Sequence, residues 1–254
     1  MSYKRSKYFT TSSKRKIKYL LSKKNSQITV VFFHGFMSDM SGKKPTALQK
    51  FCRAKKVNFL KFEYSGHGRS SGKFIEGNIS KWTKEAKQLI KSKINKKTSL
   101  IFVGSSMGSW IALNLFSNFK KQIKGFLGIG SAPEFLTYLM WNKFPKKVKN
   151  EIINKGIYKL KNGQHEYLIT HQLIKDGRKN KVLNKPITSK IPITMVHGSI
   201  DEVVPKIYSK KVLKLFPNGK KKLKIINNGD HSLSSNRNLK IILKELSQLL
   251  KKID

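Results

Sequence analysis

Short runs of β-branched and aromatic residues, separated by stretches with apolar positions at helical spacing, recur along most of the chain. The runs show no polar alternation, which indicates strands that are covered on both faces. The clearest are residues 28–33, 57–64, 100–103, 123–129, 191–196 and 223–226, and helices are expected at 45–54, 79–94, 205–215 and 238–251. This alternation predicts an α/β protein with a mostly parallel, eight-stranded-type sheet flanked by helices.

Two segments depart from the alternation. Residues 17–21 lie among lysines and predict a strand at the edge of the sheet, where charges discourage pairing with other chains. From 132 to 190 the strand and helix order stops, residues 135–141 are apolar and aromatic, and helical pieces are expected at 145–153 and 166–175. We therefore predict a single domain, residues 1–254, in which 132–190 form a small helical cap insert. Its underside would provide an apolar wall for substrate as well as pack onto the core.

The strand at 100–103 breaks at Gly104-Ser105-Ser106-Met107-Gly108, and helical spacing follows the break. A strand, a sharp turn and a helix are the context in which a G-x-S-x-G motif predicts a nucleophile elbow. Ser106 would occupy a strained backbone position, so the residues two places before and after it have to be small. The new helix would also direct free N–H groups at an approaching oxygen, which stabilises developing negative charge there.

The strand at 28–33 ends in His34-Gly35-Phe36-Met37. Serine hydrolases place their second oxyanion donor directly after such a buried strand, on the residue that follows the glycine. We therefore predict that the backbone N–H of Phe36 has this role. A simple turn at the end of the strand would look the same in isolation.

A serine nucleophile needs a base, and the base needs an orienting carboxylate. In this architecture the chain order is serine, acid, histidine. Only His231 follows the last predicted strand, whereas the other histidines are His34, His67, His165, His171 and His197. Asp201 lies just beyond the carboxyl end of a strand, where sites on open sheets form, and Glu202 is the alternative. His197 is expected to shape the loop that carries the acid.

Other candidate motifs indicate supporting roles. The loop 65–70 is rich in glycine but lacks the Gly-Lys-Ser/Thr ending of a phosphate loop, so His67 is expected to order this loop. Cys52 is the single cysteine and is expected to be a buried structural thiol. No pair of histidines has the spacing of metal ligands, and we predict neither a metal nor a cofactor.

The net charge is extreme, because 54 basic and 13 acidic residues give +41. Such a charge attracts nucleic acid, anionic membranes or acidic substrates. However, 48 of the basic residues are lysines and only 6 are arginines, spread along the whole chain, whereas shaped phosphate sites favour arginine forks. We therefore expect no specific nucleic-acid binding. The sequence contains no apolar run long enough to span a membrane and no signal peptide, so a cytoplasmic location is expected.

At the motifs around Phe36, Ser106, Asp201 and His231 the sequence resembles the α/β-hydrolase superfamily over essentially its full length. Segments 31–40, 62–68 and 103–108 are similar to one branch of it. That branch includes the mitochondrial acyl-protein thioesterase also known as mycophenolic acid acyl-glucuronide esterase, and its bacterial relatives. The resemblance implies an α/β-hydrolase fold, a triad of Ser106, Asp201 and His231, and oxyanion donors at Phe36 and Met107.

Two residues differ from what is usual in this branch. Glu63 stands where the branch usually has Asp, and Ser109 stands where it usually has Gly. Neither position belongs to the implied triad. Ser109 is expected to tighten the packing of the helix behind the nucleophile.

These observations predict a serine hydrolase that cleaves a carboxylic ester or thioester through an acyl-enzyme on Ser106, with long-chain acyl thioesters among the expected substrates. The expected substrate is a small or acylated molecule, because the apolar residues 135–141 suit acyl chains better than acetyl groups. Two alternatives are an acyltransferase that uses the same triad with another acceptor, and a non-catalytic polyanion-binding protein on a hydrolase scaffold. The oligomeric state cannot be predicted from the sequence.

Overall fold

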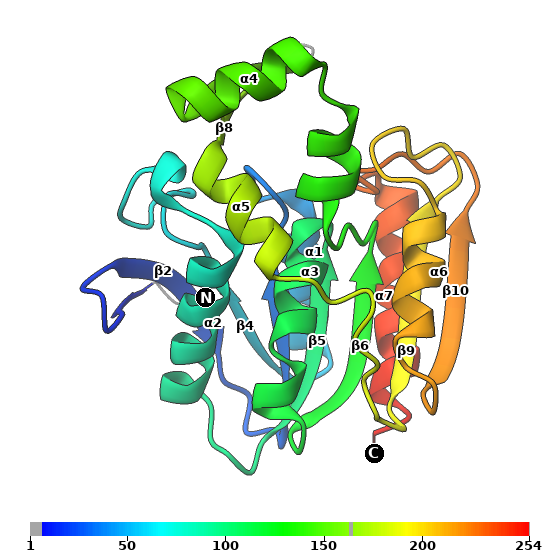
Figure 1. Cartoon of the computed structure of the whole chain (residues 1–254). Coiled ribbons are helices and arrows are strands. Elements are labelled where there is room, and N and C mark those ends of the chain that lie inside the picture. The colour runs from blue at the N-terminus through cyan, green and yellow to red at the C-terminus, as the bar shows by residue number, and fades with distance from the viewer. Residues whose placement is uncertain (1–6, 163–164, 254) are drawn as a thin grey trace.

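The computed structural model describes residues 7–162 and 165–253, and within them eight strands form one twisted sheet (Figure 1). The order across the sheet is β1-β2-β4-β3-β5-β6-β9-β10. The strands are β1 (Lys7–Thr10), β2 (Lys16–Ser22), β3 (Ile28–Phe33), β4 (Asn58–Phe62), β5 (Ser99–Ser105), β6 (Ile123–Ile129), β9 (Pro192–Gly198) and β10 (Lys220–Ile226). Strands β1 and β2 are antiparallel to their neighbours and all other pairs are parallel. The prediction of a mostly parallel sheet is confirmed.

Burial along the strands explains this order. The central strands β3, β5 and β9 are buried at nearly every position, as expected for parallel strands that are covered on both faces. Exposed lysines lie on the two edge strands instead: Lys7 opens β1, and Lys220 and Lys221 open β10. The strand predicted at the edge, residues 17–21, is β2, which lies one place in from the edge because β1 pairs with its outer side. Exposed lysines on edge strands oppose pairing with another chain.

Helices cover both faces of the sheet (Figure 1). On one face α2 (Ile79–Lys93), α3 (Met107–Asn114) and α6 (Ile207–Lys214) bury a large core that includes Trp82 and Trp110. On the other face α1 (Lys43–Ala54) and α7 (Asn236–Leu250) pack around Cys52 and Leu246. Cys52 is fully buried, and burial raises the pKa of its thiol to about 12, as expected for a structural cysteine.

Residues 132–190, which we call the insert, lie between β6 and β9 (Figure 1). Its described residues up to Lys179 stand over the carboxyl end of the sheet, and residues 180–190 run back past α3 to the start of β9. A short π-helix, η3 (Leu136–Met140), and a 3₁₀ turn, η4 (Trp141–Lys143), come first. Helix α4 (Lys146–Lys155), the antiparallel pair β7 (Ile157–Asn162) and β8 (His165–Thr170), and helix α5 (His171–Lys179) follow. The insert is therefore helical only in part.

The helix predicted at 166–175 is wrong in its first half, because residues up to Thr170 form strand β8. Tyr167 and Ile169 pair across the hairpin with Leu160 and Tyr158, so their alternation follows the strand period. Helix α5 starts only after Thr170, whose hydroxyl accepts a hydrogen bond from the Leu173 N–H at 3.2 Å. This N-cap fixes the boundary between strand and helix.

Candidate active site

Ser106 lies on the tight turn between β5 and α3, with φ 51° and ψ −119°. A non-glycine residue rarely adopts a positive φ, so the surrounding structure has to hold it there. A Cβ atom on Gly104 would come within 2.5 Å of the Ser109 backbone, and one on Gly108 within 2.1 Å of the Phe33 carbonyl oxygen. Both glycines are therefore required for the turn to lie this close to the helix and to β3.

The structure brings Ser106, His231 and Asp201 together from three loops at the carboxyl end of the sheet. Ser106 Oγ lies 3.1 Å from His231 Nε2, and His231 Nδ1 lies 2.8 Å from Asp201 Oδ2. The side chain of Asp201 is 1% exposed and that of His231 is 23% exposed, so the imidazole edge reaches solvent while the acid does not. An ionised carboxylate can only accept, so Nδ1 carries the ring proton and Nε2 is free to accept from Ser106.

Four donors surround the Asp201 carboxylate. His197 and His231 both reach Oδ2, at 3.1 and 2.8 Å, while the backbone N–H groups of Val203 and Val204 donate to Oδ1 at 3.0 and 2.8 Å. Burial alone would raise the pKa of Asp201, but the hydrogen bonds from His197 and His231 hold it well below its usual range. The acid therefore stays ionised at neutral pH.

His197 is fully buried at the end of β9. Its Nε2 lies 2.8 Å from the Val204 carbonyl oxygen as well as near Asp201, and both of these partners are acceptors. Nε2 must then carry the proton, and Nδ1 accepts from the Ser209 hydroxyl at 2.8 Å. His197 thus contacts the acid-bearing turn directly. Ser209, on α6, is a partner that no sequence motif predicts.

The loop after β3 lies against the elbow, because a Cβ on Gly35 would meet Ser106 Cβ at 3.5 Å. Its conformation is held by His34, whose Nδ1 lies 2.8 Å from the Gly35 carbonyl oxygen. Phe36 follows Gly35 in this loop, and Met107 is the first residue of α3. Within the described residues neither of these two backbone N–H groups donates to another backbone or side-chain group. Both are therefore available to an oxygen at Ser106.

Beneath this loop His34 and His67 pack ring to ring, with centroids 5.0 Å apart. Burial and the neighbouring His67 lower the pKa of His34 to about 3. Burial lowers the pKa of His67 to about 4, although a hydrogen bond to the Ser65 carbonyl oxygen opposes this shift. Both imidazoles are therefore neutral at pH 7. They support the site from below and do not contact Ser106.

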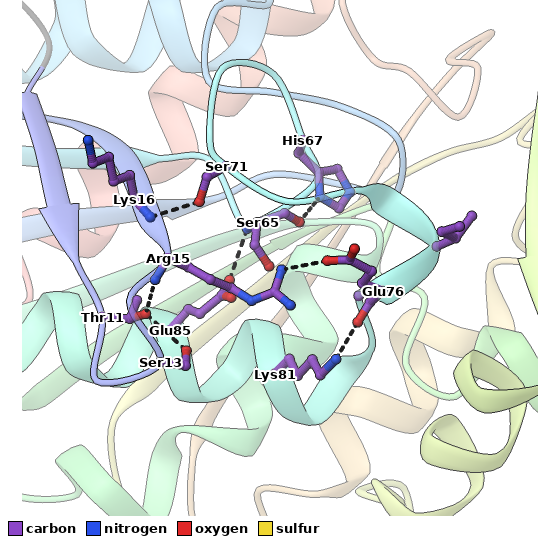
Figure 2. Close-up of polar contacts among 12 residues, drawn as sticks. Thr11, Ser13, Arg15, Lys16, Ser65, His67, Ser71, Glu76, Lys81 and Glu85 are labelled. Atoms are coloured by element: carbon purple, nitrogen blue, oxygen red, sulfur yellow. Dashed lines mark hydrogen bonds and ion pairs between the residues drawn. The ribbon is translucent and has the colours of Figure 1, made fainter.

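The glycine-rich loop around His67 is tied to β2 and to α2 (Figure 2). The Lys16 N–H donates to Ser71 Oγ at 2.8 Å, and the Ser65 N–H donates to the buried Glu85 at 2.9 Å. Figure 2 also shows Arg15, in the turn between β1 and β2, reaching Glu76 at 3.2 Å, which links this turn to the 3₁₀ turn η1 (Phe74–Glu76). These contacts indicate that the loop has a structural role, which agrees with its lack of a phosphate-binding motif.

The two residues that differ from the branch both have clear partners. Ser109 Oγ donates to the Gly104 carbonyl oxygen at 2.8 Å and accepts from Ser131 Oγ at 2.9 Å, so it joins α3 to β5 behind the nucleophile. Glu63 accepts from the Arg69 N–H at 2.7 Å, and a Cβ on Gly68 would lie 2.4 Å from its carboxyl carbon. Gly68 has no Cβ, so it leaves room for the Glu63 side chain, and its φ of +53° is one that glycine adopts readily.

Aromatic side chains gather beside the elbow. Phe36 makes ring contacts with Phe74, Phe135 and Tyr167, at centroid distances of 5.1, 5.3 and 6.2 Å. Phe135 in turn meets Trp110 of α3 at 5.9 Å. These rings come from the loop after β3, from η1 and from the insert, so the surroundings of Ser106 are largely apolar.

Three further observations concern the described residues. Among the described residues, no group of three or more His, Cys, Asp or Glu side chains is arranged to hold a metal ion. In the same part of the chain no helix combines the length and the apolar character that crossing a bilayer would require. Lys44 of α1, which the sequence did not single out, donates to the Ser232 carbonyl oxygen and to Ser234 Oγ, and so braces the loop that carries His231.

The chain matches the Hydrolase_4 family, described as serine aminopeptidase, S33, over residues 24–186. It is 26% identical over 227 residues to the mitochondrial palmitoyl-protein thioesterase ABHD10 of Bos taurus, an alignment that covers 88% of this chain and 73% of that protein. The crystal structure of a putative hydrolase from Agrobacterium vitis S4 superposes with a TM-score of 0.91 at 28% identity, covering 98% of this chain and 99% of that one.

Mouse α/β hydrolase domain-containing protein 10 superposes with a TM-score of 0.89 at 25% identity, over 98% of this chain and 100% of that one. Because the mammalian relatives are described as mitochondrial, the cytoplasmic location expected from the sequence stays a prediction. The family match extends over more than half of the sequence, and the sheet order agrees with it. The chain therefore belongs to the Hydrolase_4 family and is an α/β-hydrolase of the branch that includes ABHD10.

Proposed function

We propose that the protein hydrolyses a carboxylic ester or thioester of an acyl chain through an acyl-enzyme on Ser106. The observation that carries the proposal is the continuous hydrogen-bonded line from Ser106 Oγ through His231 to Asp201, at 3.1 and 2.8 Å. A serine hydroxyl held within hydrogen-bond reach of a base, which is itself oriented by a third group, is the arrangement of an activated nucleophile.

In the first half of the reaction His231 Nε2 accepts the Ser106 proton while Oγ bonds to the substrate carbonyl carbon. The carbonyl oxygen becomes an oxyanion, to which the backbone N–H groups of Phe36 and Met107 donate. Loss of one such donor typically costs about 3–4 kcal/mol of barrier. His231 then returns the proton to the leaving alcohol or thiol as its bond to carbon breaks.

In the second half a water molecule gives its proton to His231 and attacks the acyl carbon. The acid forms as the bond to Ser106 Oγ breaks, and His231 reprotonates the serine. Asp201 holds the productive tautomer of His231 throughout and stabilises its cationic form. Because four donors keep Asp201 ionised, this role does not require the acid to change its protonation state.

An acyl chain is the substrate part that the aromatic surroundings favour. Beside the nucleophile, the ring of Phe36 contacts the rings of two insert residues, Phe135 and Tyr167. The relatives named palmitoyl-protein thioesterase support the same substrate class. We also propose that the insert, residues 132–190, acts as a cap within one domain and covers the chain of a bound substrate.

A fluorophosphonate probe tests the nucleophile, because it phosphonylates only an activated serine. We expect labelling of the wild type and none of Ser106→Ala. The matched control is Ser105→Ala, which removes the neighbouring hydroxyl and should label like the wild type. Equal labelling of Ser106→Ala and wild type would refute the assignment.

The acyl preference is tested with p-nitrophenyl esters and acyl thioesters of increasing chain length. We expect kcat/KM to be higher for medium and long chains than for acetate, because each CH₂ buried among the rings contributes up to about 0.8 kcal/mol. A maximum at acetate would contradict the proposed substrate class. Partition of the acyl group between water and added alcohols distinguishes a hydrolase from an acyltransferase.

A further inference from the structure

Large apolar side chains that reach solvent concentrate at one end of the molecule. Among the described residues ten such side chains are exposed by 36–57%, and eight of them lie on segments that follow the carboxyl ends of strands. The eight are Met37, Ile75, Tyr138, Ile153, Leu168, Ile200, Val203 and Ile207. The other two, Tyr8 and Ile225, lie on β1 and β10, at the two edges of the sheet.

This is also the end that holds Ser106. Met37 lies in the loop beside the elbow, and Ile200 and Val203 lie on the same turn as Asp201. The insert joins these segments, because Lys211 of α6 contacts the ring of Tyr138 in η3 at 5.9 Å. Helix α4 is the outermost element of the insert (Figure 1), and its residue Ile153 is 49% exposed.

Positive charge accompanies these apolar side chains. Up to Lys179 the insert contains 10 basic and 4 acidic residues, a net charge of +6, and one of the acids, Glu134, is buried. Helix α4, which exposes Ile153, also exposes Lys146, Lys147 and Lys155, the last of which pairs with Glu151 at 3.2 Å. The start of α6 repeats the combination, since Ile207 is exposed between the exposed Lys206 and Lys210.

Exposed apolar side chains among lysines fit a lipid surface better than a nucleic acid. Aliphatic and aromatic tips gain free energy by entering the acyl boundary, while lysine heads remain with the phosphates of anionic lipids. A bare phosphate backbone offers partners to the lysines but none to the isoleucines, valine and leucine. The charge complementarity therefore favours a bilayer that contains anionic lipid.

We propose that the end of the molecule formed by the insert and the Asp201 turn docks on an anionic bilayer, so that acyl substrates reach Ser106 from the membrane. The inference rests on the proposed function for the identity of the substrate, but docking itself requires no catalysis. It can therefore be measured on the Ser106→Ala protein, which separates its failure from failure of the hydrolase proposal.

Trp141 provides a native reporter. Trp82 and Trp110 are fully buried, whereas Trp141 lies half-buried in the insert, beside Lys149 and Arg178. We expect the fluorescence of the Ser106→Ala protein to shift to the blue on adding vesicles of phosphatidylcholine with phosphatidylglycerol. Phosphatidylglycerol with brominated chains should quench it, because bromine quenches only on close approach.

Two sets of variants distinguish the contribution of apolar side chains that enter the bilayer from the contribution of lysines that bind lipid phosphates. Replacing Ile153, Leu168 and Ile207 by Ser should weaken vesicle binding about tenfold or more, because partial burial of each side chain is lost. Replacing Lys146 and Lys147 by Gln should weaken it by about fivefold per lysine. The control, Tyr8→Ser with Ile225→Ser, removes two exposed apolar side chains from the sheet edges and should bind like the parent.

Several results would overturn the proposal. One is binding to vesicles that is abolished by modest salt and is equally weakened in the apolar variant and its control, which would indicate a charged surface only. Another is tight binding to single-stranded DNA without any response of Trp141 to brominated lipid. Binding to pure phosphatidylcholine as strong as to mixed vesicles would exclude the electrostatic part.

Discussion

His197 shows how much of the candidate site depends on a residue that takes no part in the proposed bond-making steps. It contributes one of the four donors to Asp201, from a fully buried position that Ser209 orients. Because hydrogen bonds to charged groups are worth about 1.5–3 kcal/mol, the His197→Leu variant should lower kcat by about tenfold or more and leave KM nearly unchanged. His197→Gln should recover much of the rate, since its amide N–H can occupy the position of Nε2.

A purely structural role for His197 would give a different result. Melting temperatures of the two variants would then fall together, and kcat per folded molecule would stay at the wild-type value. The pKa of Asp201 provides a second measurement, because loss of a donor should raise it in an NMR titration of His197→Leu.

His34 and His67 give a prediction about stability and pH. Their pKa values in the folded protein, about 3 and about 4, lie below the ordinary value of 6.5. The unfolded chain therefore binds more protons in this window, so the stabilisation is fully present above about pH 6.5 and is lost as the pH falls toward 4 and then 3. Urea unfolding of the wild type between pH 7 and 4 should show this decline.

The matched variant is His67→Phe, which keeps a ring between Phe74 and Trp82 but does not titrate. Its stability should fall less steeply over the same pH range. Nε2 of His67 is buried and, among the described residues, has no hydrogen-bond partner, so the substitution breaks no bond at that atom. A slope equal to that of the wild type would show that His67 does not contribute.

The residues that meet at the elbow were predictable because the carboxyl ends of parallel strands share one edge. Ser106, Asp201 and His231 each follow a recognisable strand, so their meeting depended only on the strand order. The Ser209 and Lys44 contacts were not predictable. They depend on side-chain rotamers on α6 and α1, and no periodicity in the sequence encodes which loop a serine or lysine will reach.

At the scale of elements, the insert is where sequence and structure differ most. The main sheet repeats one pattern many times, so errors at single boundaries do not alter it, whereas the hairpin β7–β8 is a short pair outside that repeat. Residues such as Glu166 and Leu168 have high helix propensity, so local preference favoured a helix here. Pairing with β7 makes this segment a strand instead, and such long-range pairing is not visible in local propensity.

The exit of the insert is fixed by one buried acid, Glu134, at the start of η3. Its Oε1 accepts from the N–H groups of Val182 and Leu183 at 2.8 and 2.7 Å, just after α5. Glu134→Leu should destabilise the protein by about 1–3 kcal/mol for each amide left without an acceptor. Glu134→Gln retains a carbonyl acceptor and should cost less. Chemical denaturation of the two variants measures the difference, and equal loss in both would contradict this reason.

At the scale of the whole molecule, the charge of +41 acts on the folded state itself. With 13 acidic residues, most lysines have no carboxylate to pair with, so like charges repel across the surface. Salt screens such repulsion, and the Debye length falls from about 30 Å at 0.01 M to about 8 Å at 0.15 M ionic strength. The melting temperature should therefore rise as NaCl increases over this range.

The rise of the melting temperature with NaCl should be smaller in a variant with a lower net charge. A variant in which several exposed lysines of β10 and α7 are replaced by Gln should be more stable at low salt and less sensitive to added NaCl. These lysines lie on the sheet edge and on the face opposite α3, far from the end that holds Ser106, so labelling by the fluorophosphonate probe should not change. A melting temperature that falls with added salt would show that local ion pairs stabilise the folded protein more than lysine repulsion destabilises it. Ion pairs such as Lys222 with Glu245, at 2.6 Å, are few among the described residues, so we expect the melting temperature to rise with salt.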